Sequence, residues 1–161
     1  MSQGLKKAAV FCIIRSGDKY LLLKRSKMPN AGKYVPPGGK IEPFESPGQA
    51  VIREIQEETG MVIRDPFFCG ILTESSPTDY NWISYIYLAE TEYFDPPACD
   101  EGDFYWIDER DLEHLDTPPT DWHIYQYCAA GKHFVFDAEF DENLHMLRME
   151  ELLEGLVVFR P

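Results

Sequence analysis

The chain has 161 residues, a formal net charge of −13 and a hydrophobic fraction of 44%. This length and apolar content are typical of one folded unit, so we expect a single domain over residues 1–161. The acidic excess excludes nucleic-acid polymers as partners, because no cluster of lysine and arginine offsets it. No apolar run approaches the ~18 residues that span a bilayer, so we expect no membrane contact.

The cysteines are few and widely spaced. They are Cys12, Cys69, Cys99 and Cys128, with no Cys-x-x-Cys pair. This pattern is too sparse for a disulfide framework and indicates reduced thiols in a cytoplasmic protein. A small phosphorylated ligand remains compatible with the negative charge if a divalent cation accompanies it.

In the first half of the chain, strands surround one helix. Apolar runs on either side of the turn Ser16-Gly17-Asp18 predict a β-hairpin from about residue 6 to 25. A proline-rich loop follows over residues 26–37. Beyond a helical stretch, residues 62–75 and 81–93 have the β-branched and aromatic content of strands.

The second half mixes strands and short helices. Residues 103–107 and 133–140 predict strands, and residues 108–115 predict a short helix. A second helix is expected over residues 120–132, with Thr120 or Asp121 as its N-cap and Gly131 at its end. Residues 141–161 fit a strand, a helix or both. The order of elements predicts an α+β domain with a mixed β-sheet.

The helix between these halves has well-defined end signals. Ser46 fits the N-cap, Pro47 the first helical position, and Gln49 completes a capping box. Gly60 is a natural stop. Three glutamates, Glu54, Glu57 and Glu58, fall within one arc of this helix, beside an apolar arc.

Each pair of glutamates three or four positions apart on the helix costs about 0.2–0.5 kcal/mol, because the like charges repel. An ordinary solvated acidic face is one explanation. The other is a cation site, because a small divalent ion prefers carboxylate oxygens. The surrounding residues favour the second explanation. Gly39 is followed after five residues by Glu45, and after seven more by Arg53-Glu54-Ile55; Glu57-Glu58 and Gly60-Met61 complete the pattern.

This pattern, over residues 39–61, resembles the signature of the Nudix hydrolase family, and the flanking segments resemble its MutT-like branch. The resemblance implies an α/β/α sandwich and an enzyme that hydrolyses a pyrophosphate linkage with Mg²⁺ or Mn²⁺. It also implies that Glu54, Glu57, Glu58 and the carbonyl of Gly38 are metal ligands. Either Glu54 or Glu58 would act as the general base.

Other positions of the resemblance have two interpretations. Glu101 matches a further carboxylate ligand of the MutT-like branch, but it also fits a solvent-facing loop acid. Arg53, which belongs to the catalytic group, is expected to pair with Glu45 and fix the loop to the helix, the alternative being a phosphate contact. Gly39 and Gly60 are expected to be structural.

The remaining expectations concern the substrate. Asp121 matches the base-recognition aspartate of enzymes that clear 8-oxo-purine nucleoside triphosphates, unless it only caps its helix. Tyr34 or Trp122 would supply an aromatic surface, and Lys24 and Arg25 would meet the phosphates or form a solvated strand end. Val35 stands at a base-reading position of the related mammalian enzyme.

The expected reaction converts a purine nucleoside triphosphate such as 8-oxo-dGTP to the monophosphate and pyrophosphate. Val35 and Pro118 differ from the residues of the related mammalian enzyme, and these departures leave two alternatives open. One is a hydrolase for another nucleoside diphosphate derivative, such as ADP-ribose, a nucleotide-sugar or a dinucleoside polyphosphate. Another is a binding module without turnover. Both a monomer and a homodimer fit the sequence.

Overall fold

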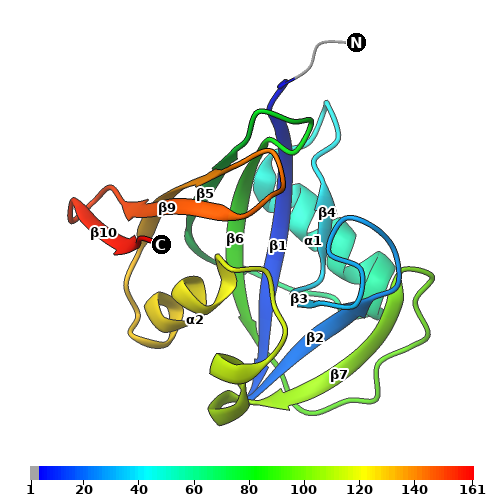
Figure 1. Cartoon of the computed structure of the whole chain (residues 1–161). Helices are drawn as coiled ribbons and strands as arrows, with labels where there is room; N and C mark the ends of the chain where they lie inside the picture. The colour runs from blue at the N-terminus through cyan, green and yellow to red at the C-terminus, as the bar shows by residue number, and fades with distance from the viewer. Residues whose placement is uncertain (1–3) are drawn as a thin grey trace.

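The computed structural model describes residues 4–161, which form a mixed β-sheet with one α-helix on each face (Figure 1). The strands are β1 (Lys7–Ser16), β2 (Lys19–Arg25), β3 (Tyr34–Val35), β4 (Gly38–Lys40), β5 (Phe67–Ser75), β6 (Trp82–Glu90), β7 (Gly102–Asp108), β8 (Phe134–Phe140), β9 (Met146–Glu151) and β10 (Leu156–Phe159). The helices are α1 (Pro47–Thr59), the 3₁₀ helix η1 (Glu109–His114) and α2 (Asp121–Ala129). The expected α+β sandwich is confirmed.

The sheet follows the order β10-β9-β8-β5-β6-β1-β2-β3, with β4 paired to β1 and β7 to β2. The pairs β1–β6 and β5–β8 are parallel, whereas the others are antiparallel. The expected β1–β2 hairpin is present, but its strands pair only beside the turn, where Arg15 lies opposite Tyr20. Farther along β1, strand β4 replaces β2 as the paired neighbour and places Gly38 opposite Phe11. This fork brings the glycines of β4 beside α1.

Helix α1 begins and ends as its sequence predicts. The Gln49 N–H donates to Ser46 Oγ at 3.2 Å, and the Ser46 N–H donates to Gln49 Oε1 at 2.9 Å, which completes the capping box. Gly60 ends the helix in the left-handed conformation at φ 75°, which glycine adopts without steric penalty. The local sequence is sufficient to predict both helix ends, because each capping interaction joins residues within four positions of each other.

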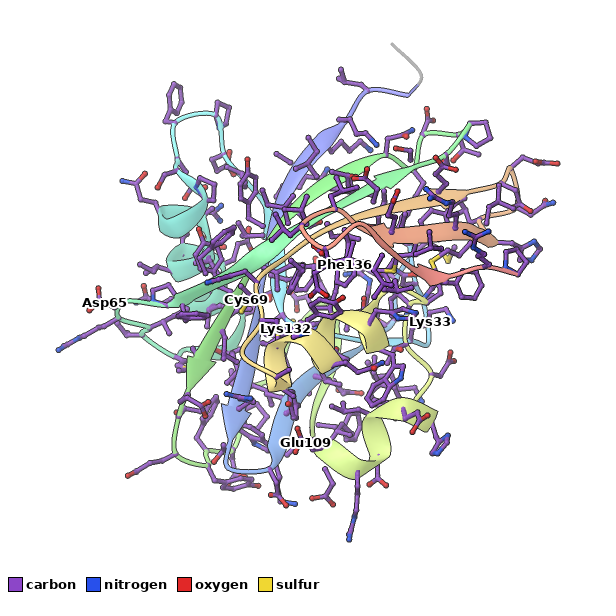
Figure 2. The ribbon with its side chains drawn as sticks, turned by 90° about the vertical axis from the view of Figure 1, so that its left-hand side faces the viewer. Lys33, Asp65, Cys69, Glu109, Lys132 and Phe136 are labelled. Atoms are coloured by element: carbon purple, nitrogen blue, oxygen red, sulfur yellow. The ribbon has the colours of Figure 1, made fainter. Side chains whose placement is uncertain are left out.

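Two apolar clusters hold the layers together. On one face, α1 buries Val51 and Ile55 against Val10 and neighbouring residues of the sheet. On the other face, α2 packs against Cys69 and Phe136, which are labelled in Figure 2. Alternate residues of β1 belong to opposite clusters, as a strand buried on both faces requires.

In the second half, the structure decides three expectations. The segment expected to be a short helix is the 3₁₀ helix η1, and the ambiguous tail forms β9 and β10. Thr120 precedes α2, but neither Thr120 nor Asp121 makes a side-chain cap hydrogen bond. The four cysteines are free thiols. No helix within residues 4–161 is long and apolar enough to cross a membrane.

Replacement of Ile55 by alanine tests the packing of α1 on the sheet. Ile55 is fully buried, so Ile55→Ala is expected to lower the free energy of unfolding by about 2–5 kcal/mol. Its neighbour Gln56 is exposed, and Gln56→Ala serves as the matched control with an expected change within about 0.5 kcal/mol. Urea denaturation of both variants measures the difference, and equal stabilities would contradict this packing.

Candidate active site

One cavity of about 600 Å³ brings together segments that are far apart in the sequence. Its walls come from β1, β4, β5 and β6, from the glutamates of α1, and from the start of α2. The lining residues that matter for the chemistry are Arg25, Val35, Gly38, Gly39, Glu54, Glu58, Glu74, Tyr80, Trp82, Glu101, Thr120 and Asp121. The α1 glutamates therefore face the same space as the α2 aspartate.

The guanidinium of Arg53 organises the carboxylates beside this cavity. Its Nε and Nη2 atoms donate to the two oxygens of Glu45 at 2.6 and 2.7 Å, the planar geometry that favours arginine over lysine. Its Nη1 atom donates to Glu54 at 2.9 Å and to Glu57 at 3.3 Å. The hydrogen bonds from Arg53 lower the pKa of Glu45 to about 2. The expected ion pair between Glu45 and Arg53 is therefore present.

The two glycines of β4 allow close approach of the chain. A Cβ atom at Gly39 would lie 2.5 Å from the Glu54 carboxylate, and one at Gly38 would collide with the carbonyl of Val10. The Gly38 N–H donates to Glu58 Oε2 at 2.9 Å. Gly39 thus leaves room for the Glu54 carboxylate, and Gly38 orients that of Glu58.

Glu101, in the connection from β6 to β7, faces the same part of the cavity. It lies 3.6 Å from the guanidinium of Arg25, which also lines the cavity. Burial, followed by repulsion from Glu101 and Glu54, raises the pKa of the Glu58 carboxyl to about 8. Glu101 and Glu54 are therefore close enough to Glu58 to disfavour its charged form.

This donor set fits a hard divalent cation, which prefers carboxylate and carbonyl oxygens and would offset the mutual repulsion. Within residues 4–161, no three His, Cys, Asp or Glu side chains stand close enough to hold a metal as they are arranged. Protein donors account for this arrangement, because Arg53 engages Glu54 and the Gly38 N–H engages Glu58. Glu57 is 60% exposed and lies outside the cavity lining.

The other end of the cavity is also acidic. Asp121 is buried at the start of α2 and accepts a hydrogen bond from Thr120 Oγ1 at 3.1 Å. Glu74, on β5, is equally buried and accepts one from the Tyr80 hydroxyl at 3.0 Å. The alternative in which Asp121 only caps its helix finds no hydrogen bond to support it.

Only some of the residues expected to contact substrate line the cavity. Val35 and Asp121 line the cavity, whereas Lys24, Tyr34 and Trp122 lie outside the lining. Lys24 Nζ instead lies 5.6 Å from the Tyr34 ring centroid. Trp122 packs against the core beneath α2.

Sequence analysis assigned no role to two residues that line the cavity, namely Glu74 and Trp82. Of the two basic residues expected at the end of β2, Arg25 lines the cavity and Lys24 does not, because neighbouring side chains of a strand point to opposite faces. Glu74 lies directly opposite Trp82 in the β5–β6 register. The sequences of β5 and β6 alone do not indicate that Glu74 and Trp82 face a cavity.

The chain resembles known proteins over most of its length. The NUDIX domain family model matches residues 5–128. The chain is 31% identical over 140 residues to YvcI, described as an uncharacterized Nudix hydrolase of Bacillus subtilis, covering 81% of this chain and 87% of that protein. An ADP-ribose pyrophosphatase of Methanocaldococcus jannaschii is 42% identical over 69 residues, 43% of this chain and 40% of that one.

Among solved structures, the MutT protein of Bacillus halodurans superposes with a TM-score of 0.80 at 23% identity. The superposition covers 91% of this chain and 98% of that chain, so the two share one fold. The family match, the relatives and the carboxylate helix beside the cavity agree with one another. The chain therefore belongs to the Nudix domain family and is a Nudix pyrophosphohydrolase with a MutT-like fold.

Proposed function

We propose that this enzyme hydrolyses a purine nucleoside triphosphate, with 8-oxo-dGTP as the leading candidate, to the monophosphate and pyrophosphate. One observation carries the proposal. The cavity that contains Glu54 and Glu58 also contains the buried carboxyl of Asp121. A buried carboxyl in a cavity needs a hydrogen-bond partner, and the edge of a purine offers donors and acceptors that meet this need.

The residues divide into roles by their contacts. Glu58 and Glu101, with Glu54 and the Gly38 carbonyl, would hold Mg²⁺ or Mn²⁺. When bound, this ion supplies positive charge that offsets the phosphates and activates water. We assign the general base to Glu54, because Arg53 holds its carboxylate in one orientation at 2.9 Å. Arg25, at the cavity wall, is placed to contact phosphate.

ADP-ribose is the second candidate substrate. It is favoured by the similarity to the ADP-ribose pyrophosphatase of Methanocaldococcus jannaschii, although that similarity covers 43% of this chain. A panel of 8-oxo-dGTP, dGTP, dATP, dCTP, ADP-ribose and a nucleotide-sugar, assayed with Mg²⁺, separates the candidates. Faster hydrolysis of ADP-ribose than of any triphosphate would overturn the first proposal. No turnover on any of them would favour a binding module.

Two neighbouring glutamates offer a matched test of the metal site. Glu58 lines the cavity, whereas Glu57 is largely exposed and contacts Arg53. Glu58→Gln is therefore expected to lower kcat by about 100-fold or more, and Glu57→Gln by a smaller factor. Both proteins should remain folded. Assays with increasing Mg²⁺ and with excess chelator measure the effect, and full activity in chelator would contradict a metal-dependent reaction.

Gly39→Ala tests the close approach of β4 to α1. The added methyl group would meet the Glu54 carboxylate at 2.5 Å, so we expect kcat/KM to fall by about 10-fold or more. Gly48→Ala is the control, because its Cβ would come no closer than 3.9 Å to a neighbouring residue. Unchanged activity in Gly39→Ala would show that the position of Glu54 is not critical.

Asp121→Ala tests recognition of the base. Loss of the carboxyl leaves a polar group on the edge of a bound purine unpaired in a desolvated site, at a cost of about 1–3 kcal/mol. KM for the preferred purine triphosphate should therefore rise by roughly 5- to 150-fold, with little change for dCTP. Steady-state kinetics on 8-oxo-dGTP, dGTP and dCTP measure this. A uniform change across the three nucleotides would refute the recognition role.

A further inference from the structure

Two carboxyl side chains meet the cavity at the end remote from α1. Glu74 comes from β5 and Asp121 from the start of α2, and each is only 6% exposed. One oxygen of each is bonded, Glu74 Oε2 by the Tyr80 hydroxyl and Asp121 Oδ1 by the Thr120 hydroxyl. Within the described chain, no hydrogen bond reaches Glu74 Oε1 or Asp121 Oδ2, and neither atom is fully enclosed. Both atoms are therefore open to the cavity.

The neighbouring cations bond to other groups. Lys6 Nζ donates to the backbone carbonyl of Glu74 at 2.6 Å and to Ser75 rather than to the Glu74 carboxylate. Lys33 pairs with Asp116 at 2.9 Å. Neither buried carboxyl thus has an ion-pair partner within residues 4–161, and binding a proton is the remaining way to lower their charge.

The surroundings of Glu74 and Asp121 determine which of the two carboxyls binds a proton more readily. Burial, with smaller opposing effects from Tyr80 and Lys6, raises the pKa of Glu74 to about 7. Burial and then repulsion from Glu74 raise the pKa of Asp121 to about 8, against Thr120 and Lys33. Asp137 on β8 is also charged, and its attraction favours the charged form of Lys6. Repulsion disfavours a charge on both carboxyls at once. The Tyr80 hydroxyl, which donates to Glu74 Oε2 at 3.0 Å, and Lys6 favour the charged form of Glu74, so we place the single proton on Asp121.

We infer that Glu74 is a second specificity-determining residue, which shares one proton with Asp121 so that the pair selects the 2-amino-6-oxo edge of a guanine-type base. This inference rests on the proposed function of the same site. The Glu74 carboxylate accepts hydrogen bonds from N1–H and the 2-amino group, and the Asp121 hydroxyl donates to O6. In the same orientation, an adenine edge presents the N1 acceptor to the Glu74 carboxylate and the 6-amino donors to the Asp121 hydroxyl, so the Glu74 charge is left unpaired.

Equilibrium binding of dGMP and dAMP tests the inference without turnover. Isothermal titration calorimetry is carried out at about pH 6, 7.5 and 9, on either side of the two carboxyl pKa values. Wild-type protein is expected to prefer dGMP by about 10-fold near pH 7.5. The preference should fall at low pH, where Glu74 gains a proton, and at high pH, where Asp121 loses its proton. The ratio of the two affinities cancels titration of the nucleotide phosphate.

Two conservative variants should behave in opposite ways. Glu74→Gln replaces the acceptor by an amide with only one acceptor oxygen and should lower the dGMP preference by about 10-fold. Asp121→Asn supplies a permanent donor for O6, so it should retain the preference and hold it at high pH. Glu139→Gln, an exposed carboxyl on β8, is the control and should match wild type. A purely structural role for Glu74 would leave the affinity ratio unchanged in every folded variant.

Equal affinity for dGMP and dAMP at all pH values, or no binding of either, overturns the inference. Hydrolysis of the nucleotide panel is measured separately, so a flat affinity ratio with active hydrolysis contradicts the pair but not the proposed function. If Glu74→Gln fails to fold, the pH profiles of wild type and Asp121→Asn still decide. A wild-type preference that does not vary with pH would then contradict proton sharing.

Discussion

The site depends on the contacts of the Arg53 guanidinium. It binds both oxygens of Glu45 and reaches Glu54 and Glu57, so one cation fixes the loop before α1 and two carboxylates on the helix. This fork stabilises the charged forms of its partners. Glu58 has no such contact, and its pKa is raised by burial and by Glu101 and Glu54. The arrangement therefore offsets part of the repulsion and leaves the rest for a bound cation.

Local patterns predicted helix α1 well, because its determinants are close in sequence. The capping box joins Ser46 to Gln49, and the stop at Gly60 depends on its own backbone. The tail was ambiguous for the opposite reason. β9 and β10 form by pairing with β8 and with each other, and residues 141–161 alone do not reveal such partners.

Side-chain direction limited prediction of the substrate end. Lys24 and Arg25 are adjacent, yet only Arg25 lines the cavity, because the side chains of β2 alternate between its faces. Trp122 looked suitable beside Asp121, but one step along a helix turns a side chain by about 100° and directs it to the core. Glu74 becomes visible only when β5 and α2 meet at one cavity.

The two acidic ends of the cavity reduce the cost of buried charge in different ways. At the α1 end, Arg53 and a divalent cation suit carboxylates that must stay ionised to bind metal and accept a proton. At the α2 end, Glu74 and Asp121 lie beyond direct cation pairing, and protonation reduces their charge. A substrate that carries phosphates at one end and an uncharged hydrogen-bonding base at the other matches this polarity. In a chain with a net charge of −13, the same polarity favours one orientation of such a substrate, because the carboxylates that would hold a cation for its phosphates lie on α1.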